Sequence, residues 1–228
     1  MFHACGLTRK EKIWGMGYFL FETLLLAKLL PLLNALLPAP LPESEINALF
    51  FLLNFGAVAF IFRRYLRLQL VSIVNGLPTI LGTAFVGFFA YWIANFFMTQ
   101  VIWAINPEFQ SINDTAIQDM VQENFVLMLF GTVLLVPITE ECLFRGLVFR
   151  GLYDRKPVLG WICSVALFCA VHVVGYIGAY PLQMLLLCFI QYIPAGLCLA
   201  GAYRFSGSIL SPILIHAMVN LLAMVSLR

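Results

Sequence analysis

The stretch VPITEECLFR, from Val136 to Arg145, decides how the rest of the chain is interpreted. It places two adjacent carboxylates, Glu140 and Glu141, and the guanidinium of Arg145 inside an otherwise apolar run. Ionisable side chains at membrane depth cost roughly 2.5–3.5 kcal/mol each on insertion scales, so they persist mainly where they have a role. The stretch therefore predicts a functional site inside a hydrophobic helix.

The composition around this stretch is that of a membrane protein. Of the 228 residues, 62% are hydrophobic and 11% are charged, whereas soluble domains carry about 25% charged residues. Apolar blocks of about 18 or more residues are typical of transmembrane helices. We therefore expect an all-α, polytopic transmembrane bundle that forms a single domain over residues 1–228. The apolar blocks predict seven spans, at approximately 13–37, 46–62, 79–105, 125–153, 158–176, 180–203 and 207–226.

The charges predict how these spans are oriented. Basic residues gather at alternate span ends, namely Arg9, Lys10, Lys12, Arg63, Arg64, Arg67, Arg150, Arg155, Lys156 and Arg204. Because Lys and Arg accumulate in cytoplasmic loops, we expect a cytoplasmic N-terminus and a C-terminus outside. The short, bare loops favour a bacterial plasma membrane. A net charge of +2 is too small to favour nucleic acid or another polyanion as a partner.

Two segments fit this pattern less well. Lys28 lies within the first span and Glu22 six positions before it, on a different face of an α-helix, so no pair is expected. The acidic segment 112–125 is expected to be a solvated loop, with an interfacial helix capped by Asp114 as the alternative.

Prolines and cysteines add two further expectations. Pro137 and Pro194 should bend or break their helices and free backbone carbonyls that protein or water then satisfies. The six cysteines include no CxxC pair, so we expect neither a disulfide framework nor a zinc ribbon.

Helical spacing separates the two adjacent carboxylates. Glu141 and Arg145 are four positions apart and share a face, which allows an intrahelical ion pair. Glu140 projects about 100° away from Glu141. One carboxylate can therefore have a structural role, while the other can take part in a reaction.

Two of the three histidines lie in later apolar spans, while His3 is terminal. The turn between the fourth and fifth spans centres near Lys156, with Glu140 sixteen residues before it and His172 sixteen residues after it. In an antiparallel hairpin, equal distance from the turn means equal depth, so Glu140 and His172 are expected at one level.

The last span carries His216 and Asn220 four positions apart on one face. His216 lies nine residues after Gly207, about 14 Å at the helical rise, against about 24 Å for the other two groups. The depths agree if the preceding hairpin projects about 10 Å from the membrane. A carboxylate beside an imidazole can deprotonate water, and a second imidazole with an amide can stabilise an oxyanion. This chemistry is peptide hydrolysis within the membrane.

The motifs EExxxR from Glu140, FxxxH ending at His172 and HxxxN from His216 resemble those of the CAAX protease and bacteriocin-processing (Abi) family, which includes the Rce1-type CAAX prenyl endopeptidases. The resemblance covers about 125–220. It implies that Glu140 and His172 activate water without a metal and that His216 and Asn220 bind the oxyanion. It also implies supporting roles for three residues, Glu141, Arg145 and Phe168. The expected partners are the bilayer and a membrane-associated peptide or protein substrate.

Three alternatives remain open at this point. Glu140, His172 and His216 are acceptable zinc ligands in type and number, which would make the protein a metalloprotease. A non-catalytic protein of the same fold would act in bacteriocin self-immunity or as a regulatory partner of a sensor. A transporter could use the same groups as a proton relay, although no hydropathy repeat is present.

Overall fold

The computed structural model describes residues 6–71 and 73–228, and most of them are helical. His3 and Cys5 lie outside the described residues. In this described part, no β-strand is formed, and five helices are long and apolar enough to cross a membrane. Two shorter apolar helices accompany them. The predicted all-α membrane bundle is confirmed.

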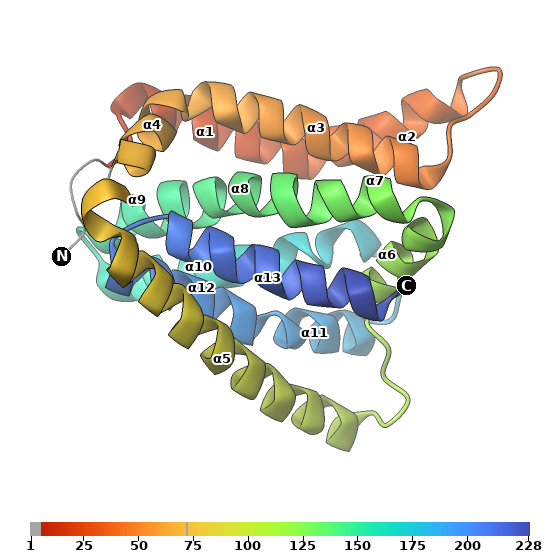
Figure 1. Ribbon diagram of the computed structural model, residues 1–228. Coiled ribbons are helices and arrows are strands. Elements are labelled where there is room, and N and C mark those ends of the chain that lie inside the picture. Colours follow the sequence, from red (N-terminus) through yellow and green to blue (C-terminus); the bar gives the residue numbers. More distant parts are fainter. Residues whose placement is uncertain (1–5, 72) are drawn as a thin grey trace.

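The chain runs back and forth along one axis (Figure 1). In chain order the elements are α1 (Arg9–Phe21), η1 (Glu22–Leu26), α2 (Ala27–Ala35), α3 (Glu43–Ile61), α4 (Arg63–Val71), α5 (Ile73–Ile105), α6 (Ile112–Glu123), α7 (Phe125–Phe130), η2 (Gly131–Leu135), α8 (Val136–Glu141), η3 (Cys142–Phe149), α9 (Arg150–Tyr153), α10 (Pro157–Val171), η4 (Val174–Tyr176), α11 (Leu182–Gln191), α12 (Ile193–Ser206) and α13 (Leu210–Ser226). Each of the seven predicted spans contains one of the apolar helices.

The segment predicted as a solvated loop is a helix, α6, so that prediction was wrong. Its N-cap is Ser111, whose hydroxyl accepts a hydrogen bond from the backbone N–H of Asp114 at 3.3 Å. The helix buries Ile112 near its start and Val121 near its end, each in a different apolar cluster of the bundle. Burial of a few apolar residues therefore stabilises this helix, although its sequence shows only a weak helical periodicity.

Two other boundaries differ from the prediction. The basic segment after the second span forms α4, in which Tyr65 and Gln69 are buried. The fifth span ends at Val171, and His172 is the residue that caps it. His172 therefore lies at the C-terminal end of its helix.

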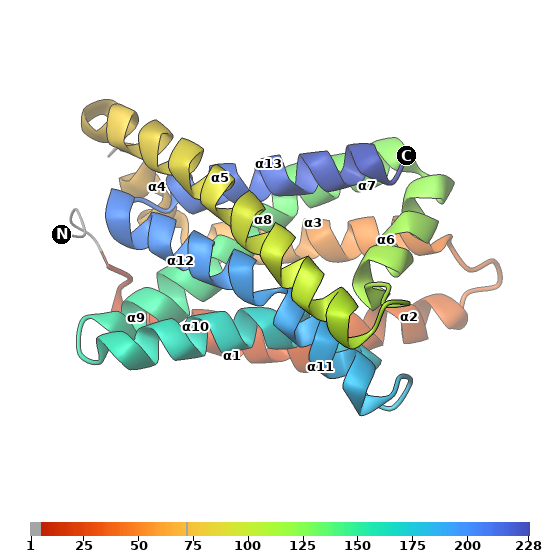
Figure 2. The same cartoon turned by 90° about the horizontal axis from the view of Figure 1, so that it is seen from below.

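Helix α5 crosses obliquely over α12 and α13 and leaves much of its length uncovered (Figure 2). Its uncovered face carries large apolar side chains such as Phe85 and Phe96, which is the surface expected against lipid. Where α5 meets α13, Gly87 lets the Ile215 side chain approach its backbone. Small residues at such crossings allow close helix packing in membranes.

A turn separates the two helices at Pro194 as expected, whereas at Pro137 the helix continues and only changes from π-helical to α-helical turns. Pro137 lies in the first turn of α8, directly after the π-helical turn η2. Pro194 lies in the first turn of α12, and Tyr192 separates this helix from the end of α11. Both positions lie beside the polar cavity described next.

Candidate active site

The segment from α7 to α9 forms one rod in which the short helix α8 is flanked by the π-helical segments η2 and η3. Such π segments are rare and are frequent at functional sites. Glu141 is completely buried, whereas the side chain of Glu140 is 22% exposed and lines a cavity of about 710 Å³. The two adjacent carboxylates therefore have different environments, as the helical spacing predicted.

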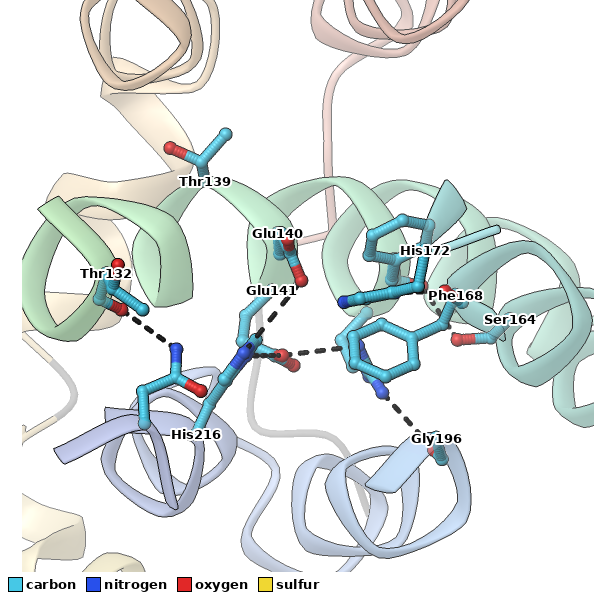
Figure 3. Close-up of polar contacts among 12 residues, drawn as sticks. Thr132, Thr139, Glu140, Glu141, Ser164, Phe168, His172, Gly196 and His216 are labelled. Carbon is cyan, nitrogen blue, oxygen red and sulfur yellow. Dashed lines mark hydrogen bonds and ion pairs between the residues drawn. The ribbon is translucent and has the colours of Figure 1, made fainter. Parts of the chain in front are cut away.

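Glu141 and Arg145 form a fully buried ion pair. The Oε1 atom of Glu141 lies 3.2 Å from a terminal guanidinium nitrogen of Arg145. The other terminal nitrogen donates to the backbone carbonyl of Gly196 at 3.3 Å, and the guanidinium lies 4.5 Å from the ring centre of Phe168. Arg145 thus connects its own rod with α10 and α12, and Figure 3 shows two of its partners, Glu141 and Gly196.

The same Oε1 atom of Glu141 also contacts His216, from α13, at 2.9 Å from its Nδ1. Because the carboxylate oxygen in the ion pair with Arg145 accepts hydrogen bonds, Nδ1 of His216 is the donor. The other ring nitrogen, Nε2, lies 3.9 Å from Oε2 of Glu140, beyond hydrogen-bond distance (Figure 3). Among the described residues, that Oε2 atom has no hydrogen-bond partner.

The ring of His172 is held by its own helix and by a tyrosine. Its Nδ1 lies 2.7 Å from the backbone carbonyl of Phe168, which can only accept, so Nδ1 carries the hydrogen. The ring stacks on Tyr192 at 4.0 Å between centroids. These contacts leave the lone pair of Nε2 as the available proton acceptor on His172.

Asn220 forms a hydrogen bond with a backbone carbonyl that lacks a backbone N–H donor within its own helix. In the π-helical turn η2, Val136 donates to the carbonyl five residues earlier, that of Gly131. The next such bond would join Pro137 to Thr132, but proline has no N–H. The amide of Asn220 donates to the Thr132 carbonyl instead, at 2.8 Å. The predicted freeing of a backbone carbonyl by Pro137 is therefore observed, and a site residue satisfies it.

The structure thus brings the four predicted reactive groups to one place. Glu140, His172, His216 and Asn220 come from three separate helical segments and line the same cavity. The buried ring of Phe168 lies beneath them, 4.8 Å from the ring of His172 and 6.0 Å from that of His216. Three helices therefore present two imidazoles, a carboxylate and an amide to one enclosed space.

The zinc alternative does not fit this arrangement. Within residues 6–71 and 73–228, no group of three or more His, Cys, Asp or Glu side chains is placed to hold a metal ion. The Nδ1 atoms of both histidines are already used, that of His216 in the hydrogen bond to Glu141 and that of His172 in the hydrogen bond to the Phe168 carbonyl. Among the described residues, these side chains therefore do not form a ligand set for zinc.

Sequence reasoning did not find several partners in the site. The hydrogen bond between Glu141 and His216 and the stacking of Tyr192 on His172 join residues far apart in the chain. Glu22, on η1, also lines the cavity. Two signals in the sequence could have indicated these residues. Pro194, which interrupts its helix, lies just after Tyr192, and Glu22 is a charged residue in an apolar run.

These features define a polytopic helical membrane protein with a carboxylate and imidazole site inside its bundle. Residues 122–222 match the family described as type II CAAX prenyl endopeptidase Rce1-like. The matched segment includes all seven residues predicted for the site. Comparison with curated proteins and with solved structures returned no match.

Proposed function

We propose that the protein is an intramembrane endopeptidase that hydrolyses a peptide bond in a membrane-associated peptide or protein. The family assignment supports a protease of the CAAX type. The observation that carries the proposal is the convergence of Glu140, His172, His216 and Asn220 on one cavity. The apolar helices make it a multi-pass membrane protein, and its short loops favour a bacterial plasma membrane.

Glu140 is the general base of the proposed reaction. Its carboxylate lines the cavity, and its Oε2 atom has no hydrogen-bond partner among the described residues. A water in the cavity gives one proton to Glu140, and its oxygen forms a bond with the carbonyl carbon of the substrate. The Nε2 atom of His172, left as an acceptor, orients the same water through its second hydrogen.

His216 and Asn220 stabilise the negative charge that then develops on the carbonyl oxygen. Asn220 uses one amide hydrogen on Thr132 and retains the other. When Nε2 of His216 carries a proton, it donates to the oxyanion, and the carboxylate of Glu141 balances the positive charge on the ring. Glu140 finally passes its proton to the leaving nitrogen as the C–N bond breaks, which releases a carboxylic acid and an amine.

The decisive experiment compares the wild type with Glu140→Gln in cells and as purified protein. Gln keeps the size of the side chain and removes the base, so specific cleavage of membrane peptides and proteins should fall by at least about 100-fold. Glu43→Gln removes an exposed carboxylate outside the cavity and should cleave like the wild type. Metal analysis of the purified wild type should show no stoichiometric zinc.

Two results would contradict the proposal. Equal cleavage by the wild type and Glu140→Gln would show that this carboxylate is not the base. A cellular phenotype that persists in Glu140→Gln, with no cleavage products in either strain, would instead favour a non-catalytic protein of the same fold, such as an immunity factor or the regulatory partner of a sensor.

A further inference from the structure

The first span contributes a carboxylate to the cavity from outside the segment that matches the protease family. Glu22 begins the π-helical turn η1, within the apolar run YFLFETLLLA, and is only 9% exposed. It lines the same cavity as Glu140. The span that carries it packs against α3 and η3 (Figure 1). A buried carboxylate at this depth is costly and calls for a partner.

The described residues do not supply that partner. Glu22 forms no hydrogen bond or ion pair with any of them. The nearby Tyr18, one turn earlier, donates its hydroxyl to Asn54 instead. Glu140 lines the same cavity as Glu22, and burial and a neighbouring like charge both make an ionised carboxylate costly in a poorly solvated space.

The rest of the cavity does not compensate this charge either. Lys28 is the only Lys or Arg among the described residues that line it, and its side chain is exposed and not paired with Glu22. The guanidinium of Arg145 is committed to Glu141 and Gly196. A cation that enters the cavity would therefore find in Glu22 a carboxyl group that no Lys or Arg among the described residues already pairs.

We propose that Glu22 is a specificity-determining residue that binds the ammonium or guanidinium group of a Lys or Arg side chain in the substrate. The proposal rests on the proposed protease function and adds the class of substrate, a membrane-associated peptide with a basic residue close to the scissile bond. A bound cation would pair with Glu22 and relieve its repulsion with Glu140. A neutral side chain of the same size would leave Glu22 unpaired, and such sites discriminate strongly against it.

The test is cleavage of a library of apolar peptides by the purified protein in lipid vesicles. The peptides are N-acetylated and C-amidated, and each position carries Lys, Arg, norleucine, Gln or Glu, so a side chain is the sole source of charge. Sequencing the products by mass spectrometry should show Lys and Arg preferred over norleucine by at least about tenfold at one position beside the cleaved bond. In Glu22→Gln this preference should fall to about one, while cleavage of norleucine peptides persists.

The controls separate a cation site from a general effect of charge or folding. Glu108→Gln removes a carboxylate from an exposed loop and should keep the preference for Lys and Arg. Glu22→Asp keeps the charge and should keep part of the preference. A wild type with no preference for basic residues, or a Glu22→Gln variant that retains it, would overturn the proposal.

A binding measurement keeps this proposal separate from the proteolytic function. If no library peptide is cleaved, or if Glu140→Gln cleaves as well as the wild type, the protease proposal fails, and thermal unfolding then decides the role of Glu22. n-Butylammonium should stabilise the wild type and Glu140→Gln more than n-butanol does, with no such difference in Glu22→Gln. Equal effects of the two compounds on the wild type would overturn the cation site.

Discussion

At the scale of single residues, Glu141 makes two buried interactions through one oxygen, the ion pair with Arg145 and the hydrogen bond with His216. Removing one member of a buried ion pair leaves an uncompensated charge, which costs about 3–5 kcal/mol. Arg145→Met should therefore lower the free energy of unfolding by about that amount, as measured by denaturation in detergent micelles. Arg155→Met, at an exposed position, should change it by less than about 0.5 kcal/mol.

A double variant separates the contribution of this pair to stability from its contribution to the site. Glu141→Leu combined with Arg145→Met removes both charges and should recover much of the lost stability. Peptide cleavage should stay low, because Nδ1 of His216 no longer has the carboxylate that orients its ring. A stable double variant with wild-type cleavage would show that Glu141 does not position His216.

The sequence predicted the interactions within one helix better than those between helices. The four-residue spacing predicted the ion pair of Glu141 and Arg145, which the structure contains. The bond from Glu141 to His216 depends on the rotation of α13 about its own axis. No local pattern in the sequence specifies that rotation, because it follows from how several helices pack together.

At the scale of elements, the π-helical turn η2 and Pro137 together make the carbonyl of Thr132 available to Asn220. Pro137→Ala restores a backbone N–H that can bond to this carbonyl in place of Asn220. Since a hydrogen bond contributes about 1 kcal/mol net, we expect the rate of peptide cleavage to fall by about fivefold to tenfold. Thermal stability should stay equal or rise, because proline is unfavourable within a helix.

A proline elsewhere gives the matched control for this variant. Pro31→Ala, in α2, restores an N–H at an exposed position away from the carbonyl of Thr132, and it should leave cleavage unchanged. If Pro137→Ala cleaves peptides at the wild-type rate, the bond from Asn220 to Thr132 does not position the amide for the reaction.

The elements themselves were predicted where apolar length determines them. All seven apolar blocks became helices, because a chain in lipid must satisfy its backbone polar groups internally. The polar helices α4 and α6 were missed, since each depends on a few buried residues, such as Ile112 and Val121 in α6. The π-helical turns were missed for a related reason. At η2, Phe51 approaches the backbone at Gly131, a contact between helices that local spacing does not encode.

At the scale of the whole molecule, charge is distributed between the two ends of the bundle. The start of α1, the helix α4, the turn between α9 and α10 and the end of α12 lie together at one end, and they carry the basic residues (Figure 1). The opposite end carries the acidic start of α3 and the helix α6. This separation predicts that the basic end is cytoplasmic.

Labelling of single cysteines with a membrane-impermeant maleimide measures this orientation. In a background without the native cysteines, Ala39→Cys, in the loop before α3, should react in intact cells, whereas Lys156→Cys should react only after permeabilisation. The same measurement assigns the cavity, because α6, several of whose residues line it, lies at the same end of the bundle as the loop before α3 (Figure 1). The expected pattern means that the α6 side of the cavity faces away from the cytoplasm. The reverse pattern would contradict the charge argument and would place that side of the cavity in the cytoplasm.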